Sequence, residues 1–187
     1  MANLIVLASG SGSNFEAIAK RVAATRHELV ALVTDKPFAG AVTRAADLEI
    51  PVEEISYKIS RIDAERELKR ICTRLTPDLI CLAGFMRILT ADFVARYPRR
   101  IVNIHPSILP AFPGLHAIER SYADTRSELG ISIHYVDAGV DTGPIIEQHR
   151  VERDTITDLA SAEAAIHRLE HRYFPEVVVR LLDALTV

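Results

Sequence analysis

An amide, an imidazole and a distant carboxylate are the residues of this chain best suited to chemistry. Residues 102–109 are Val-Asn-Ile-His-Pro-Ser-Ile-Leu, and Asp141 follows further on within Val-Asp-Thr-Gly-Pro. Asn103 and His105 are two positions apart, so on an extended strand both side chains leave the same face. Two donors aimed at one point stabilise a carbonyl oxygen that becomes an oxyanion. The pattern therefore predicts acyl-type chemistry.

Taken one by one, these residues also have ordinary structural interpretations. A single histidine such as His105 is more often a hydrogen-bonded core residue, and Asp141 begins an Asp-Thr-Gly sequence that forms turns well. Together they predict more, because a carboxylate near an imidazole favours the imidazolium. We therefore expect Asp141 to raise the pKa of His105, with Asn103 as a fixed donor. Such a trio can stabilise an oxyanion and relay a proton near neutral pH.

A second candidate site is the sequence Ser-Gly-Ser-Gly-Ser-Asn at residues 9–14, between an apolar run and a helical pattern. Glycines let the backbone approach a ligand closely, and a helix start offers free N–H groups to an anion. The loop is neither a Walker A motif nor a dinucleotide fingerprint, whose third glycine would fall at Phe15. A compact phosphomonoester fits better. The alternative is a plain turn capped by Ser13 or Asn14.

Other polar residues narrow the chemistry. Ser107 lacks the Gly-x-Ser-x-Gly elbow of serine hydrolases, which favours direct attack by a substrate amine over an acyl-enzyme. His167 and His171 have a metal-compatible spacing, but no third ligand is apparent, so we expect a solvated helix face and no metal. Ser132 and His134 lie on one strand face and are candidates for supporting the site.

The elements that must position these residues follow from hydrophobic periodicity. Apolar strands are predicted at 4–8, 29–34, 51–52, 78–83 and 100–105, and helices at 14–24, 40–48, 62–75 and 90–96. This alternation is typical of an α/β fold with a doubly wound, mostly parallel sheet. Parallel strands end at one edge, so the segments 9–13, 84–89 and 103–107 should converge.

The last third of the chain has a different pattern. Half-buried strands are predicted at 131–136 and 144–151, extending the sheet in an antiparallel sense, with a helix at 114–123. A long final helix is predicted over 155–184, interrupted or kinked near Pro175. Because no linker or repeat appears, we expect residues 1–187 to form a single domain.

Composition limits the classes of function. The chain has 187 residues, 49% hydrophobic and 25% charged, and a net charge of -3, which gives no support to a nucleic-acid surface. No apolar run approaches a membrane span, and the start lacks the basic stretch of a signal peptide. Cys72 and Cys81 are expected to be core residues in a reducing cytosol. We expect a cytoplasmic protein that acts on small molecules, without nucleic-acid or membrane partners.

Nearly the whole sequence resembles the phosphoribosylglycinamide formyltransferases, folate-dependent enzymes of purine synthesis. The shared motifs are Ser9-Gly10-Ser11-Gly12-Ser13-Asn14, Leu82-Ala83-Gly84-Phe85-Met86-Arg87-Ile88-Leu89, Asn103-Ile104-His105-Pro106-Ser107, Pro113-Gly114-Leu115-His116 and Asp141-Thr142-Gly143-Pro144. The resemblance implies a Rossmann-like formyltransferase fold with 10-formyltetrahydrofolate as co-substrate. The amine of 5'-phosphoribosylglycinamide would attack the formyl group, giving N-formylglycinamide ribonucleotide and tetrahydrofolate.

The resemblance also implies roles for individual residues. The catalytic residues would be Asn103, His105 and Asp141, with His105 as proton donor and Asp141 raising its pKa. The ribonucleotide would be held by Gly12, Ser13 and Asn14 at its phosphate and by Glu170. The folate would be held by Met86, Arg87, Ile88 and Leu89, largely through backbone groups, by Asn103, and by Arg61 near the glutamate tail.

Three other activities are alternatives to this one. A formyltetrahydrofolate hydrolase would use water in place of the amine, usually carries a further regulatory domain, and would leave the loop at 9–14 without a purpose. A non-enzymatic phosphate-binding module would not need Asn103, His105 and Asp141 together. A methionyl-tRNA formyltransferase would require a nucleic-acid domain and a basic face. Monomer and homodimer both stay open.

Overall fold

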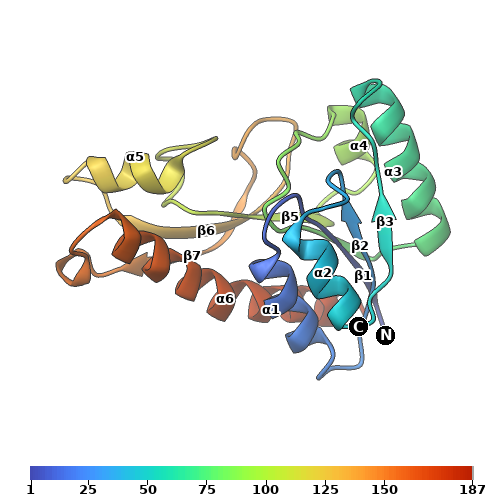
Figure 1. Cartoon of the computed structure of the whole chain (residues 1–187), viewed down its shortest axis with the longest axis horizontal. Coiled ribbons are helices and arrows are strands. Elements are labelled where there is room, and N and C mark those ends of the chain that lie inside the picture. The colour runs from blue at the N-terminus through green and yellow to red at the C-terminus, as the bar shows by residue number, and fades with distance from the viewer. Residues whose placement is uncertain (187) are drawn as a thin grey trace.

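The computed structural model describes residues 1–186 and shows one seven-stranded sheet with helices on both faces (Figure 1). The strands lie in the order β3-β2-β1-β4-β5-β6-β7; the first five are parallel, whereas β6 and β7 are antiparallel to their neighbours. Their bounds are Asn3–Leu7 (β1), Glu28–Thr34 (β2), Val52–Glu54 (β3), Leu79–Leu82 (β4), Ile101–His105 (β5), Leu129–Tyr135 (β6) and Ile145–Val151 (β7). The predicted doubly wound, mostly parallel sheet with an antiparallel extension is confirmed.

The helices form two layers. They are α1 (Ser13–Val22), α2 (Gly40–Asp47), α3 (Arg61–Leu75), α4 (Ala91–Ala95), α5 (Ala117–Ala123) and α6 (Leu159–Ala184). Helices α1, α2 and α6 pack on one face, while α3 and α4 cover the other (Figure 1). Thr90 caps α4 as predicted, since its side chain accepts a hydrogen bond from the Phe93 N–H.

The final helix differs from the prediction at its start and at its proline. It begins at Leu159 because the Asp158 carboxylate accepts from the Ser161 N–H at 2.7 Å, which closes a capping box; Arg153–Thr155 is a separate 3₁₀ turn. The helix continues through Pro175, so the predicted interruption is wrong. Buried residues on both sides of the proline pack on the sheet, and that packing outweighs one lost backbone hydrogen bond.

The central strand β1 shows why its sequence is continuously apolar. Leu4 and Val6 pack into the cluster beneath α1 and α6, whereas Ile5 and Leu7 pack into the cluster beneath α3 and α4. All four are fully buried, because a central parallel strand is covered on both faces. The two cysteines are unpaired and buried in these clusters, as predicted.

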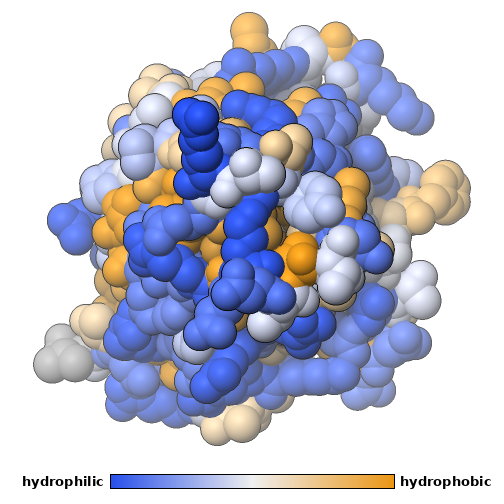
Figure 2. All heavy atoms as spheres, turned by 90° about the vertical axis from the view of Figure 1, so that its left-hand side faces the viewer, coloured by the Kyte–Doolittle hydropathy of each residue, from blue (hydrophilic) through white to orange (hydrophobic). Residues whose placement is uncertain are grey.

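The surface contrasts with this core. Figure 2 shows mostly hydrophilic residues on the face seen from the side of α5, with apolar side chains in smaller patches. Within residues 1–186, no helix combines the length and the apolar character needed to cross a membrane.

The two-layer core makes a stability prediction that two phenylalanines test. Phe174 of α6 is fully buried, whereas Phe38 is 99% exposed. Phe174→Ala should lower the free energy of unfolding by about 3–5 kcal/mol through lost burial and a cavity. Phe38→Ala should change it by less than about 0.5 kcal/mol. Denaturant titration followed by circular dichroism measures both, and equal losses would contradict the assigned packing of α6.

Candidate functional site

A cavity of about 750 Å³ opens where β1, β4 and β5 end. It is lined by residues from the segments that the sequence predicts to converge: Gly10–Asn14, Gly84–Leu89 and Asn103–Pro106. Residues from 114–119, 136–141 and α6 complete its wall. The volume lies in the range of small-molecule sites, and its position at the carboxyl edge of a parallel sheet is where such folds bind ligands.

Asn103, His105 and Asp141 come together in this cavity. The register of β5 against β6 pairs Asn103 with His134, and the Asp141 segment reaches both residues. Asp141 Oδ2 is 3.3 Å from His105 Nδ1, and Oδ1 is 3.4 Å from Asn103 Nδ2 and 3.5 Å from His134 Nε2. The Gly114 N–H donates to Oδ2 at 2.8 Å. One carboxylate therefore organises three side chains.

The environment keeps Asp141 ionised. Burial raises the pKa of this carboxyl, but the contact with His134 and the hydrogen bond from the Gly114 N–H outweigh burial and lower the pKa to about 2. Its backbone has a φ of 55°, a left-handed conformation that aspartate tolerates better than most residues. The side chain is thus a fixed negative charge at neutral pH.

Two opposing influences act on the pKa of His105. Burial is the largest influence and lowers this pKa; the Phe112 carbonyl and the Asp141 charge raise it without reversing the direction. The pKa therefore lies below its ordinary value of 6.5, although Asp141 acts in the predicted sense. The sequence reveals Asp141 as the charged partner of His105. It does not reveal that burial removes water from the imidazole ring, and this loss of water favours the neutral imidazole.

The Ser-Gly-Ser-Gly-Ser-Asn segment at residues 9–14, called the glycine loop from here on, is held against α2. Gly12 has a φ of +78° at the start of α1, and a Cβ there would lie 2.5 Å from Ala41 Cα. The Arg44 guanidinium donates from Nε to the Ser11 carbonyl at 2.9 Å. Among the described residues 1–186, neither Ser13 nor another side chain caps α1, so the helix start lies at the cavity without a side-chain acceptor.

Asn14 and Glu170 meet at the wall beside this loop. Asn14 Nδ2 donates to Glu170 Oε2 at 2.9 Å, and Asn14 Oδ1 is buried without a hydrogen-bond partner within residues 1–186. Glu170 is only 6% exposed, and burial raises its pKa while the Asn14 hydrogen bond opposes that change. His167 also lines the cavity. His167 and His171 are both exposed, so the predicted solvated helix face is confirmed, and the i, i+3 spacing of His167 from Glu170 places these two on one helix face.

The segment after β4 forms an apolar wall. Met86 and Ile88 are each 57% exposed, while Leu89 is buried. The Met86 N–H donates to Ser9 Oγ at 3.0 Å, so this backbone donor is already satisfied. These side chains provide a surface on which a flat ring can lie.

Arg61 stands apart from the other predicted residues. It is the first residue of α3 and is absent from the cavity lining. Its Nε lies 3.7 Å from Glu65 Oε1, and the same carboxylate accepts from the Thr90 N–H at 2.6 Å. Arg61 is therefore linked to the end of the 84–89 segment through Glu65 rather than placed in the cavity itself.

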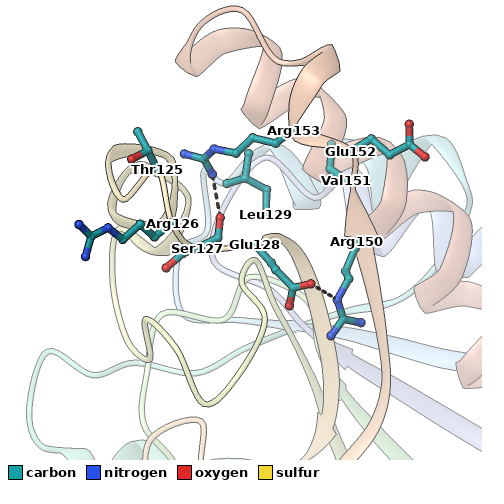
Figure 3. A pocket seen from close by; sticks show the side chains of 9 residues that line it. All are labelled: Thr125, Arg126, Ser127, Glu128, Leu129, Arg150, Val151, Glu152 and Arg153. Atoms are coloured by element: carbon teal, nitrogen blue, oxygen red, sulfur yellow. Dashed lines mark hydrogen bonds and ion pairs between the residues drawn. The ribbon is translucent and has the colours of Figure 1, made fainter.

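A second hollow, of about 520 Å³, lies where β6 begins and β7 ends (Figure 3). Two of its arginines make contacts within the fold: Arg150 Nε pairs with Glu128 Oε1 at 2.6 Å, and Arg153 donates to the carbonyls of Ser121, Tyr122 and Ser127. None of the sequence-predicted site residues lines this hollow. No group of three or more metal-binding side chains occurs within the described residues 1–186.

Comparison with known proteins agrees with this geometry. A family model described as formyl transferase matches residues 2–178. The chain is 41% identical to a phosphoribosylglycinamide formyltransferase of Bacillus subtilis (strain 168), over 97% of this chain and 95% of that protein.

Solved structures give the same result. A glycinamide ribonucleotide transformylase from Geobacillus kaustophilus superposes with a TM-score of 0.92 at 40% identity, covering 97% of this chain and 99% of that one. A phosphoribosylglycinamide formyltransferase from Streptococcus pneumoniae TIGR4 gives a TM-score of 0.90 at 39% identity, with the same coverage. The chain belongs to the formyl transferase family, among the phosphoribosylglycinamide formyltransferases.

Proposed function

We propose that this protein transfers the formyl group of 10-formyltetrahydrofolate to the amine of 5'-phosphoribosylglycinamide. The observation that carries the proposal is one cavity lined both by Asn103, His105 and Asp141 and by a helix start without an internal cap. The trio suits an acyl carbon that passes through an oxyanion, and the helix start suits the phosphate of the acceptor. The products are N-formylglycinamide ribonucleotide and tetrahydrofolate, in the synthesis of purines.

The chemistry is a direct transfer. The substrate amine attacks the formyl carbon to form a tetrahedral intermediate, whose oxyanion receives hydrogen bonds from Asn103 and His105. The amine loses one proton, and the departing nitrogen of the folate gains one as its bond to the formyl carbon breaks. His105 acts as the proton donor: Nε2 gives its proton to the departing nitrogen and takes one back as the amine loses its own, while Asp141, beside Nδ1, stabilises the protonated imidazole.

The resting hydrogen bonds of His105 set a condition on this step. Nε2 lies 2.8 Å from the Phe112 carbonyl, and a carbonyl can only accept, so Nε2 carries a proton. Donation from Nε2 to an oxyanion therefore requires that the substrate replace the Phe112 carbonyl. The Phe112 segment thus holds the donor in place until the acyl group arrives.

The two substrates occupy different parts of the cavity in this proposal. The backbone N–H groups of Gly12, Ser13 and Asn14 bind the phosphate, and Glu170 binds the ribose hydroxyls. The pterin lies against the wall formed by Met86, Arg87, Ile88, Leu89 and Asn103. Arg61, exposed at the start of α3, binds a carboxylate of the glutamate tail outside the cavity.

The wider assignments belong to the same proposal. Residues 1–187 act as a single formyltransferase domain in the cytoplasm, as a monomer or homodimer, on small molecules. Transfer needs no metal, because Asn103 and His105 can supply the oxyanion donors themselves.

Transfer with a defined acceptor is the first test. Wild-type protein should release tetrahydrofolate from 10-formyltetrahydrofolate only when phosphoribosylglycinamide is present, followed by absorbance. His105→Ala should lower kcat by about 10²–10⁴-fold with an unchanged circular dichroism spectrum, because the proton carrier and one oxyanion donor are lost. Release of folate at the same rate with water alone would refute the transferase assignment in favour of a hydrolase.

The His105–Asp141 pair predicts a titration. By NMR, the His105 imidazole should titrate below 6.5 in the wild type. In Asp141→Asn its pKa should fall further, because the negative charge that favours the imidazolium is gone. An unchanged or higher pKa in the variant would contradict the coupling, and His105→Gln identifies the resonance.

The glycine loop predicts a selective loss of affinity. Gly12→Ala must displace the loop from Ala41 and strains a φ of +78°. The KM for the ribonucleotide should rise by at least about tenfold, while the KM for the folate stays within about threefold. A substrate lacking the phosphate should bind weakly to both proteins. Equal binding with and without the phosphate would refute the role of the loop.

A further inference from the structure

The 84–89 segment is fastened to the ends of β1 and β2 by hydrogen bonds around one buried carboxylate. Asp35 follows β2, and its side chain is 0% exposed. Its Oδ1 accepts from Ser9 Oγ at 2.5 Å, and its Oδ2 accepts from Arg87 Nε at 2.7 Å. Ser9 Oγ in turn accepts from the Met86 N–H at 3.0 Å. Asp35, Ser9, Met86 and Arg87 therefore form a closed ring of contacts, in which Met86 and Arg87 are consecutive residues of the 84–89 segment.

The Arg87 side chain has a second protein contact. Its guanidinium lies 4.8 Å above the Tyr57 ring, and that ring meets Phe85 edge-on with 6.5 Å between centroids. The segment is therefore held at Phe85, Met86 and Arg87 by contacts with protein. The contact with Tyr57 depends on the direction in which the Arg87 side chain points, and Asp35 fixes this direction through Arg87 Nε.

Core packing does not fix the middle of the segment. Met86 and Ile88 are each 57% exposed, so burial of their side chains does little to fix their positions. Arg87 lies between them and is fixed by its hydrogen bond to Asp35. A buried carboxylate is costly unless its oxygens are paired, and here each oxygen has a donor. Loss of the Asp35 charge would replace the charge-assisted hydrogen bond of Arg87 by a weaker neutral one and loosen the segment.

The glycine loop is less dependent on the same ring. The Ala41 N–H donates to the Gly10 carbonyl at 3.1 Å, and Arg44 donates to the Ser11 carbonyl at 2.9 Å. These contacts with α2 hold the loop beyond Ser9 without Asp35. Met86 and Arg87 of the ring belong to the 84–89 segment. Breaking the ring should therefore loosen the cavity wall that this segment forms, and not the glycine loop.

We propose that Asp35 is a positioning residue for the folate donor, acting through Ser9 and Arg87 on the wall formed by Met86–Leu89. Asp35 does not itself line the cavity. The inference rests on the proposed function, because it assigns that wall to the folate. It separates the two substrates: Asp35 governs the affinity for the donor, and the contacts of Gly12 with α2 govern the affinity for the ribonucleotide.

Asp35→Asn tests this separation, since it keeps the shape and removes the charge. The KM for 10-formyltetrahydrofolate should rise on the order of tenfold, while the KM for the ribonucleotide and the saturated kcat stay within about threefold. Calorimetric titration with tetrahydrofolate alone should show the same weakening. Gly12→Ala should show the opposite pattern of KM values.

Two further variants make the test decisive. Arg87→Gln removes the partner of Asp35 at a half-exposed side chain, and the double variant should be no worse than either single variant. It also replaces Asp35→Asn if that variant does not fold. Glu128→Gln breaks the Arg150 pair of Figure 3, a comparable Nε–carboxylate contact, and should leave both KM values within about twofold.

The outcomes separate two kinds of failure. Folded Asp35→Asn and Arg87→Gln proteins with an unchanged folate KM, or with both KM values raised equally, would overturn the positioning role. Wild-type protein that transfers no formyl group to the ribonucleotide, yet binds tetrahydrofolate, would refute the proposed reaction and leave the Asp35 result to be judged by calorimetry.

Discussion

The parallel pairing of β1 with β4 and of β4 with β5 is the constraint on which the site depends. Parallel strands need crossovers, the crossovers supply the helices of both layers, and all carboxyl ends meet at one edge. Polar residues that follow three separate strands therefore share one cavity. Because the central strands are buried on both faces, their interior is mainly apolar, and the polar residues Asn103 and His105 lie toward the carboxyl end of β5, where the cavity opens.

Burial and charge oppose each other within the cavity. Asp141 and His105 are neighbours in the same wall, yet the pKa of Asp141 falls to about 2 while the pKa of His105 also falls. Asp141 gains enough hydrogen bonds to offset its burial, whereas the ring of His105 does not. The pair consequently joins a carboxylate that stays ionised at neutral pH to an imidazole whose pKa burial lowers and whose two ring nitrogens face the Phe112 carbonyl and Asp141.

Much of this arrangement could be predicted from the sequence, because period and spacing reveal local structure. The alternation of strands and helices placed three loops at one edge, and Thr90 marked a helix start. What depends on distant contacts could not be seen: the start of α6 at the Asp158 cap, its passage through Pro175, and the burial that lowers the pKa of His105. Asp35 carries no motif, and only the fold brings it to Arg87.

The antiparallel register between β5 and β6 has a consequence for how such a chain can change its length. Asn103 faces His134, and His105 faces Ser132, so alternate residues of β6 are directed to the site. A one-residue shift of this register would bring Ile133 or Tyr135 opposite Asn103 and send the His134 imidazole to the other face of the sheet. We therefore expect insertions to be accepted more readily in surface turns, such as the one around Arg126, than within β6.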